Sequence, residues 1–263
     1  MKKSVFSVSL LVAGLAFAGT TEVTNDYVLG VMPVSASGKK QVILSIPWVA
    51  EGGGVNAIAV TNLVKTAGLA ANDTLTWYNT SKGKYQTWKL SSGDTKYWIP
   101  QTDVSDENIE DAPTAAALAQ GQAIVLTTTA SSLPSTLYVV GQVGTRATVS
   151  TEVAGNNAWT LLAPPVVSGT DGYVDFNQVA SDGSDWASCE GDEITYAAAN
   201  GTKKSFTCTN VGTSGSPSYK WTGSFFNSVH TAPIPVGQGV WYHRIKGNDV
   251  TITWSYVPTV SAE

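Results

Sequence analysis

The sequence predicts an all-β protein built from two tandem, related units, each a β-sandwich or β-barrel with room for one short helix. Short apolar runs of strand length are separated by Gly, Asn and Pro turns along the chain. Charged residues make up only 13% of the 263 residues, whereas Gly alone contributes 25, which argues against disorder and against a coiled coil. The first half of the chain also aligns with the second, and this repeat predicts the two units.

The repeat is clearest at a Gly-Gln step followed by large apolar residues. The step occurs at residues 121–126 (GQAIVL) and again at residues 237–242 (GQGVWY). Glycine suits a tight turn with positive φ, and the apolar run after it predicts a buried strand. We expect these glycines to be architectural and to form no ligand site, because a phosphate-binding loop opens a helix whereas this step runs into a strand.

Three further stretches match in the same order in both halves. Residues 38–47 align without a gap on residues 155–164, residues 72–77 match residues 191–196, and Trp98 matches Trp221. The spacing between matches varies by a few residues, as expected for loops of unequal length between shared elements. Chance periodicity of strand patterns is the alternative to duplication. The predicted units cover residues 19–148 and residues 149–263.

The second half resembles a repeat of exported proteins of Gram-negative bacteria. The motif comprises a strand that ends at Pro164, the GDEI stretch at residues 191–194 and the PVGQGVW stretch at residues 235–241. The first half departs from it, since Ala123 replaces the second glycine and Val125 the tryptophan. The resemblance implies small β-domains, mostly in proteins of unassigned activity, and it implies no catalytic residue.

The strands of the first unit are predicted where apolar runs are bounded by turn residues. These runs lie at residues 21–34, 41–49, 74–78, 84–90, 97–99, 123–129 and 137–143. Residues 58–69 mix apolar and polar positions at about helical spacing and predict a short helix, and residues 115–119 predict a helical turn. The second unit repeats this plan from Trp159 onward.

Two features of the second unit predict antiparallel pairing. The Asn-Gly dipeptide at residues 200–201 is a strong signal for the tip of a hairpin. In the last predicted strand, Ile252 and Trp254 share one face while Thr251 and Thr253 share the other. This alternation is typical of a half-buried antiparallel strand.

Residues 1–18 predict a secretory signal peptide. Lys2 and Lys3 form the charged start, a short apolar run follows, and Ala16 and Ala18 frame the cleavage site. The run is too short to span a bilayer as a stable helix, and no later stretch has the length and apolar character of a transmembrane helix. No cysteine follows the cleavage site, so a lipid anchor is not indicated. We expect an exported protein that is periplasmic, on the outer surface or extracellular, and the resemblance implies a Gram-negative bacterium.

Charge and motifs disfavour nucleic-acid binding and catalysis. The formal net charge is −5 without a block of basic residues, so no nucleic-acid partner is expected. His230 and His243 are the two histidines, and neither has the spacing of a Ser-His-Asp triad. Standard catalytic motifs such as Gly-x-Ser-x-Gly are absent. A pair of carboxylates for glycoside hydrolysis needs only spatial proximity, so the sequence leaves this alternative open.

The two cysteines, Cys189 and Cys208, flank the predicted hairpin around residues 200–201. An even number of cysteines in an oxidising compartment favours pairing, so we expect a disulfide between them. Closing so short a loop stabilises a unit by about 3 kcal/mol in the chain-entropy description. A free catalytic thiol is the alternative, and it is disfavoured because no histidine is near in sequence.

The densest group of carboxylates is a candidate calcium site, the one cofactor that the sequence suggests. It consists of Asp103, Asp106, Glu107, Glu110 and Asp111. Ca²⁺ takes six to eight oxygen ligands and tolerates irregular loops. The spacing is not that of an EF-hand, so a solvated acidic loop is the favoured interpretation. Residues 182–185 (DGSD) are a weaker candidate of the same kind.

The chain holds nine Trp and ten Tyr. Six tryptophans lie on predicted strands and are expected in the core, namely Trp77, Trp88, Trp98, Trp221, Trp241 and Trp254. Trp48 and Trp186 fall near loops and are the candidates for contact with a glycan or a protein. Aromatic rings that stay exposed on a sheet can stack on sugar rings. Which of the strand tryptophans stay exposed is left open by the sequence.

The sequence therefore leaves three candidate functions. The first is an exported, non-catalytic structural or adhesive surface protein, whose partner is a cell-surface protein, a polysaccharide or another copy of the chain. The second is a glycan-binding module that uses exposed aromatics. The third and least favoured is a secreted hydrolase. An exposed row of aromatic rings would favour the second function, and a pocket with two close carboxylates the third.

Overall fold

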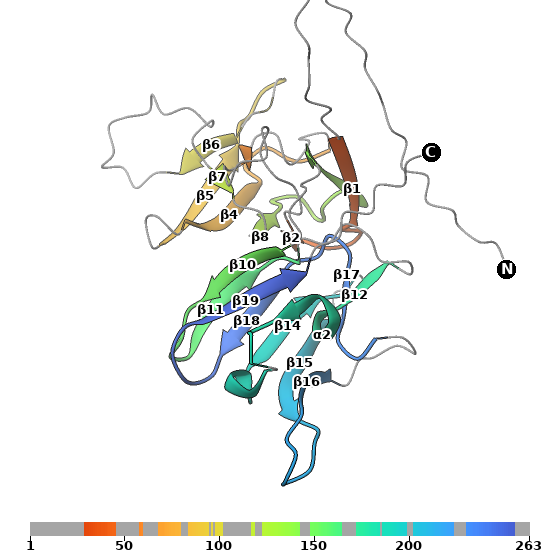
Figure 1. Cartoon of the computed structure of the whole chain (residues 1–263). Helices are drawn as coiled ribbons and strands as arrows, with labels where there is room; N and C mark the ends of the chain where they lie inside the picture. Colours follow the sequence, from red (N-terminus) through yellow and green to blue (C-terminus); the bar gives the residue numbers. More distant parts are fainter. Residues whose placement is uncertain are drawn as a thin grey trace, which may run out of the picture.

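The computed structural model describes residues 29–45, 58–59, 68–79, 84–94, 96, 98–101, 117–118, 123–142, 148–164, 172–184, 186–198, 202–223 and 230–255. These residues form a nearly all-β protein with antiparallel sheets and one short α-helix, which confirms the predicted fold class. Two five-stranded sheets dominate the structure, one from each half of the chain (Figure 1).

The first half of the chain forms one five-stranded sheet and two smaller pairs. The sheet has the order β2-β8-β4-β5-β6. Its strands are β2 (Gln41–Ser45), β4 (Thr74–Asn79), β5 (Lys84–Leu90), β6 (Trp98–Gln101) and β8 (Ala123–Thr127). The pairs are β1 (Leu29–Ser35) with β9 (Thr136–Gln142) and β3 (Ile58–Ala59) with β7 (Ala117–Leu118).

The second half forms a five-stranded sheet of order β11-β18-β14-β15-β16. Its strands are β11 (Ala158–Leu162), β14 (Glu193–Ala197), β15 (Lys203–Asn210), β16 (Tyr219–Gly223) and β18 (Val240–Arg244). The smaller sheets are β10 (Thr148–Val153) with β19 (Val250–Ser255) and β13 (Ala180–Ser181), and β12 (Tyr173–Asp175) with β17 (Pro233–Pro235). The helix α2 (Phe176–Val179) and a 3-10 turn, η2 (Ala187–Cys189), complete this half.

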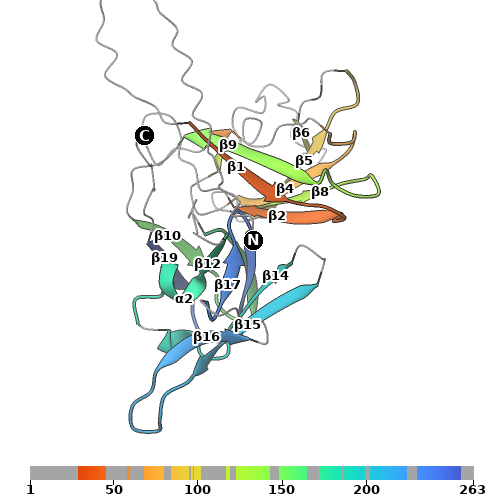
Figure 2. The same cartoon turned by 90° about the vertical axis from the view of Figure 1, so that its right-hand side faces the viewer.

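The core of each half lies between its large sheet and a smaller one. In the first half, Leu137 and Val139 of β9 pack with Trp77 of β4 in one buried cluster. In the second half, Ile252 and Trp254 of β19 belong to the same cluster as the inner face of the large sheet. Figure 2 shows β1 and β9 crossing one face of the first large sheet. Each half is therefore a two-layered, sandwich-like arrangement.

The two large sheets have the same order of corresponding strands, and their matched tryptophans hold the same position. Trp98 pairs with Leu90 across β5 and β6, and Trp221 pairs with Cys208 across β15 and β16. Both tryptophans are fully buried. This arrangement is the one that a tandem duplication predicts, and the duplication itself stays a prediction.

In each large sheet a buried carboxylate lies directly before the middle strand, Asp73 before β4 and Asp192 before β14. Asp73 accepts a hydrogen bond from the backbone N–H of Thr129 at 2.8 Å, and Asp192 accepts one from that of Ile245 at 2.9 Å. Arg244 adds an ion pair to Asp192 at 2.7 Å. In each sheet the carboxylate thus ties the start of one strand to the segment that follows its neighbour.

The predicted alignment of β2 with β11 is out of register by one residue. The ungapped match places Leu44 opposite Leu161, but Leu44 faces the core of its own half whereas Leu161 faces the junction between the halves. Leu162 is the residue that faces the second core. Because side chains alternate between faces, a slip of one residue exchanges the two faces of a strand. Both faces of β2 and part of β11 are apolar, so the pattern alone did not fix the register.

The helical turn expected at residues 115–119 is wrong where the structure describes it, at Ala117–Leu118. Ile58–Ala59 and Ala117–Leu118 form the strand pair β3 and β7, with Ile58 opposite Leu118. Short apolar runs do not distinguish a strand from a helical turn by periodicity, and here the pairing with a distant segment decides. The short helix expected within residues 58–69 stays a prediction, because residues 60–67 lie outside the described part of the chain.

Candidate functional site

The two halves meet where the Gly-Gln step of the second half lies along the edge of the first large sheet. Backbone hydrogen bonds join Ser45 N to Gly237 O and Gly239 N to Ile43 O, both at 2.9 Å. A β-bridge between Leu44 and Gln238 lies between them. No other described strand pairs with this edge of β2, so the second half covers an open strand edge, a site at which β-proteins are prone to aggregate.

The glycines of this step meet two different requirements. Gly237 has φ +80°, which confirms the positive φ expected there. Gly239 lies against the first half, where an added Cβ would be 2.6 Å from Ile43 Cγ2 and 2.9 Å from Ala123 Cβ. Its counterpart in the first half is Ala123, and residues 121–122 lie outside the described part of the chain.

Gln238, between the two glycines, is buried and joins the halves through its side chain. Its Nε2 donates hydrogen bonds to Ile43 O and Gly239 O, both at 2.9 Å. Ser45 Oγ also donates to Pro164 O at 2.5 Å. An apolar cluster surrounds these bonds and consists of Ile43, Ala123, Val125, Leu161 and Ala163, with Trp241 packed against it. Hydrogen bonds and apolar contacts therefore hold the junction together.

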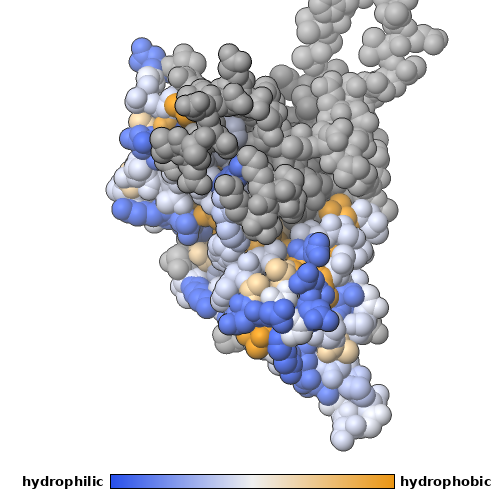
Figure 3. All heavy atoms as spheres, turned by 90° about the vertical axis from the view of Figure 1, so that its left-hand side faces the viewer, coloured by the Kyte–Doolittle hydropathy of each residue, from blue (hydrophilic) through white to orange (hydrophobic). Residues whose placement is uncertain are grey.

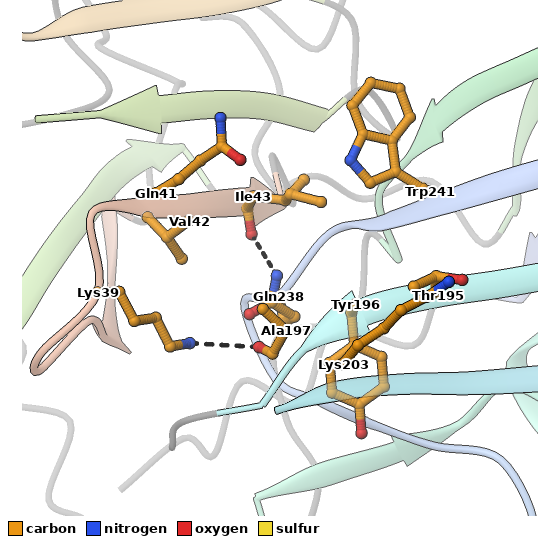
Figure 4. Close-up of a pocket in the computed structure, with 10 residues that line it drawn as sticks. All are labelled: Lys39, Gln41, Val42, Ile43, Thr195, Tyr196, Ala197, Lys203, Gln238 and Trp241. Atoms are coloured by element: carbon orange, nitrogen blue, oxygen red, sulfur yellow. Dashed lines mark hydrogen bonds between the residues drawn. The ribbon is translucent and has the colours of Figure 1, made fainter. Parts of the chain in front are cut away.

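A pocket of about 200 Å³ opens beside this junction (Figure 4). The first half contributes Lys39, Gln41, Val42 and Ile43, and the second contributes Thr195, Tyr196, Ala197, Lys203, Gln238 and Trp241. This described lining contains two lysines and no carboxylate. Neither half forms the pocket alone.

Lys39 is the most unusual residue of the pocket because it is a buried cation. It is 7% exposed, and its Nζ donates to the carbonyl oxygen of Ala197 at 3.3 Å. Burial lowers the pKa of its ammonium. Lys203 differs, since its side chain is 64% exposed and lies 3.6 Å from Glu193. The pKa of Glu193 is lowered because hydrogen bonds from Ser205 and the charge of Lys203 outweigh the effect of burial.

Aromatic side chains continue outward from the pocket across both halves. Trp241 of β18 has its ring centroid 6.3 Å from that of Tyr85 of β5 and 6.5 Å from that of Trp159 of β11. Trp159 stacks on His243 at 4.1 Å with the rings nearly parallel. We call these four residues the aromatic row. Tyr85 is 43% exposed and Trp159 is 45% exposed.

The pairing of the strands fixes the ring positions in the row. Trp159 lies opposite His243 in the register of β11 and β18, and Trp241 lies two residues before His243 on the same face. The His243 ring is held by a 2.7 Å hydrogen bond between its Nε2 and Asn157 Oδ1. Figure 3 views the molecule from the side on which β11 and β18 lie in Figure 1, and its described surface there is mostly polar, with small separate apolar patches. Strand pairing thus places Trp159, Trp241 and His243 on one face of the second large sheet.

The expectation that the strand after the Gly-Gln step buries Trp241 is only half met. Trp241 lies at the junction and remains partly exposed. The core role expected of the other strand tryptophans is confirmed by their burial. These residues are Trp77, Trp88, Trp98, Trp221 and Trp254.

Trp186 is a core residue, so the contact role expected for it is wrong. It is 5% exposed and packs against Phe176 and Trp221. Its backbone adopts φ +67°, and its N–H donates to Asp182 Oδ1 at 3.0 Å. This turn directs the ring inward although the residue lies beside a loop. Trp48 lies outside the described residues.

The expected disulfide is not formed, and Cys189 and Cys208 are buried free thiols. Each thiol has its own acceptor: Cys189 Sγ donates to Asp182 Oδ2 at 3.3 Å, and Cys208 Sγ donates to Trp186 O at 3.4 Å. Burial raises the pKa of Cys189 to about 11 and that of Cys208 to about 12. Neither thiol is therefore activated as a nucleophile at neutral pH.

The candidate calcium cluster of Asp103, Asp106, Glu107, Glu110 and Asp111 lies outside the described residues. Within the described ranges, no group of three or more His, Cys, Asp or Glu residues could hold a metal ion. The weaker candidate around Asp182 is a hydrogen-bonded turn, because that carboxylate accepts bonds from the N–H groups of Ser184 and Trp186 and from the hydroxyl of Ser188.

His230 lies near a carboxylate, but the arrangement is structural. Its Nδ1 is 3.9 Å from Asp175 Oδ2. Asp175 caps α2 by accepting from the N–H of Asn177 at 3.0 Å, and it also accepts from the N–H of Thr231 at 2.8 Å. The carboxylate thus fixes the start of the helix to the strand segment before β17.

No family model, curated protein or solved structure matches the chain. Among the described residues, no helix has the length and apolar character needed to cross a membrane. Sequence reasoning missed Lys39 and Trp159 as site residues. The alternation around Trp159 and around His243 was the one signal that could have placed both rings on the same face.

Proposed function

We propose that the protein is an exported, non-catalytic adhesive β-protein that binds carbohydrate on the aromatic row. The observation that carries the proposal is the exposure of Tyr85 and Trp159 on either side of Trp241. The row crosses from one half of the chain to the other, so it presents a contact surface longer than one ring.

The chemistry of these rings suits sugars. Tyr and Trp offer a large contact area with little conformational entropy to lose, and their polar atoms tolerate partial exposure. The C–H faces of a sugar ring pack on such rings while the hydroxyls remain hydrated. Because paired strands and the stack of Trp159 on His243 fix the rings, little ordering accompanies binding.

The other two functions have less support. Self-assembly through the edge of β2 is disfavoured because residues 237–239 already cover that edge. A glycoside hydrolase needs two carboxylates around its substrate, and the described lining of the pocket has none. Export, and a location in the periplasm, on the surface or outside the cell, belong to the same proposal and rest on residues 1–18.

Affinity electrophoresis in native gels that contain neutral or acidic polysaccharides tests the proposal. We expect at least one polysaccharide to retard the protein and Trp159→Ala to weaken this binding about tenfold, the size of a contact worth 1.4 kcal/mol. Tyr138→Ala is the matched control, since Tyr138 is 47% exposed but lies on β9, outside the row. The proposal is overturned if no polysaccharide retards the protein, or if Trp159→Ala binds as the wild type does.

A further inference from the structure

The pocket beside the aromatic row holds a buried lysine that no described carboxylate neutralises. Lys39 lies there with 7% exposure, and among the described residues no carboxylate forms an ion pair with it. An ammonium group offers three donors, and the one acceptor found for Lys39 is Ala197 O at 3.3 Å. A buried cation without a counter-ion is costly, so such a group marks a place where an anion is favoured.

A second cation borders the same space. Figure 4 shows Lys39 on one side of Ala197 and Gln238 and Lys203 on the other, with the Lys203 amine beside Thr195. Lys203 contacts Glu193 at 3.6 Å, but its side chain is 64% exposed. An exposed pair of this kind contributes little free energy, so Lys203 can turn toward a new partner at small cost. The pocket therefore offers one fixed cation and one adjustable cation.

The size and position of the pocket indicate what kind of anion fits. A volume of about 200 Å³ lies below the roughly 300–1,000 Å³ of sites for drug-sized ligands, so it suits a single sugar-sized unit. Trp241 belongs both to this lining and to the aromatic row. A polymer that lies on the row thus passes the mouth of the pocket.

We propose that the pocket binds a carboxylate-bearing sugar unit of the polysaccharide, of the uronic acid type, with the carboxylate at Lys39 and the ring against Trp241. This inference rests on the proposed function and names the class of its ligand. Lys203 adds a second positive charge at the outer side. Binding at a place shared by both halves would also depend on the junction remaining intact.

Calorimetric titration of the purified protein with trigalacturonate and with neutral galactotriose tests this assignment. We expect the acidic trisaccharide to bind about tenfold more tightly or better at moderate salt, a preference of 1.4 kcal/mol. Lys39→Met should abolish the preference, since methionine keeps most of the apolar length of the side chain without its charge. Lys40→Met is the matched control, because Lys40 is the exposed neighbour of Lys39 and does not line the pocket.

The outcomes separate this assignment from the proposed function. Equal binding of both trisaccharides, with Trp159→Ala weakening both, sinks the acidic-sugar assignment and leaves carbohydrate binding in place. An unchanged preference in Lys39→Met also overturns the assignment, and so does equally strong competition by acetate, which would show a site for any carboxylate. If neither trisaccharide binds, the acidic-sugar assignment is contradicted, even if longer polysaccharides bind. Acidic binding that depends on Lys39 but not on Trp159 supports the pocket and contradicts the role of the row.

Discussion

Gln238 donates a hydrogen bond from its side-chain amide to the carbonyl oxygen of Ile43 at 2.9 Å, across 195 positions of the sequence. It is buried between the two halves, and the glycines on either side of it give the backbone its turn and its close approach. The stretch that most clearly reveals the repeat is therefore also the contact that joins the two halves. The same contact forms one wall of the pocket.

Gly239→Ala should destabilise the junction. An added Cβ would lie 2.6 Å from Ile43 Cγ2, and overpacking of this kind costs about 1–3 kcal/mol. Urea unfolding followed by tryptophan fluorescence measures the loss. Gly215→Ala is the control, because nothing lies within 4 Å of the position of its Cβ. Equal stability of the two variants would show that the close approach at Gly239 is easily relaxed.

Gly237→Val should lower the melting temperature more than Gly237→Asn. Gly237 has φ +80°, a region that a β-branched residue resists and that asparagine tolerates. Differential scanning calorimetry of both variants makes the comparison, and a valine variant as stable as the asparagine variant would contradict it. Loss of ligand binding with full stability would instead assign this step to the binding site.

Asp192→Ala should destabilise the protein more than Asp73→Ala. Removing the Asp192 carboxylate leaves Arg244 buried without its partner, which costs about 3–5 kcal/mol. The described donors to Asp73, such as the hydroxyl of Thr128, are neutral, so its loss costs about 1–3 kcal/mol. Chemical denaturation of the two variants provides the measurement. Adding Arg244→Met to Asp192→Ala should recover part of the loss, and failure to do so would contradict the role of the stranded charge.

Asp182→Asn should reduce stability at pH 5 but much less at pH 2. Although burial alone would raise it, hydrogen bonds from Ser188, Ser184 and Trp186 lower the pKa of Asp182 from 3.8 to about 2. A carboxyl whose pKa is depressed by folding contributes stability above its unfolded pKa and loses it as the pH falls through the folded value. Thermal unfolding of both proteins between pH 2 and pH 6 measures the difference. A gap between the two proteins that stays constant with pH would contradict this account.

The two thiols should be unreactive in the native protein and titratable after unfolding. Cys189 and Cys208 are buried, and the raised pKa of each disfavours the reactive thiolate. Mass spectrometry after alkylation without reductant should show two labels in denaturant and none under native conditions. Absence of both labels in denaturant would mean that a disulfide forms after all.

The fold class was predictable from the sequence because alternation and turn residues are local signals. The equivalence of Trp98 and Trp221 was predictable as well, since an isolated large residue marks its position in a repeat. The register of β2 against β11 was not, because Ile43 and Leu44 are both apolar and either could face the core. An alternating pattern shows which residues share a face of a strand. It does not show which of two apolar faces packs on the core and which contacts the other half of the chain.

The binding surface was harder to predict than the fold because it arises from contacts between distant segments. Lys39 becomes a buried cation only when β14 of the other half lies over it, and nothing in the residues around it signals this burial. The opposite error arose at Trp186, which was expected to be exposed because it lies near a loop. A backbone turn directs its ring into the core instead. Proximity to a loop in sequence is thus a weak guide to exposure.

The long-range pairing at β2 also sets an order for folding as the chain emerges. Until residues 237–239 have been made, one side of β2 has no partner within the described chain. A chain that ends before this point keeps an open edge to which a second molecule can add a strand. Contacts between residues so distant in sequence form slowly. The edge of β2 therefore stays exposed throughout synthesis of the second half. The late residues 237–239 therefore guard the first half against pairing with another copy once synthesis has passed them.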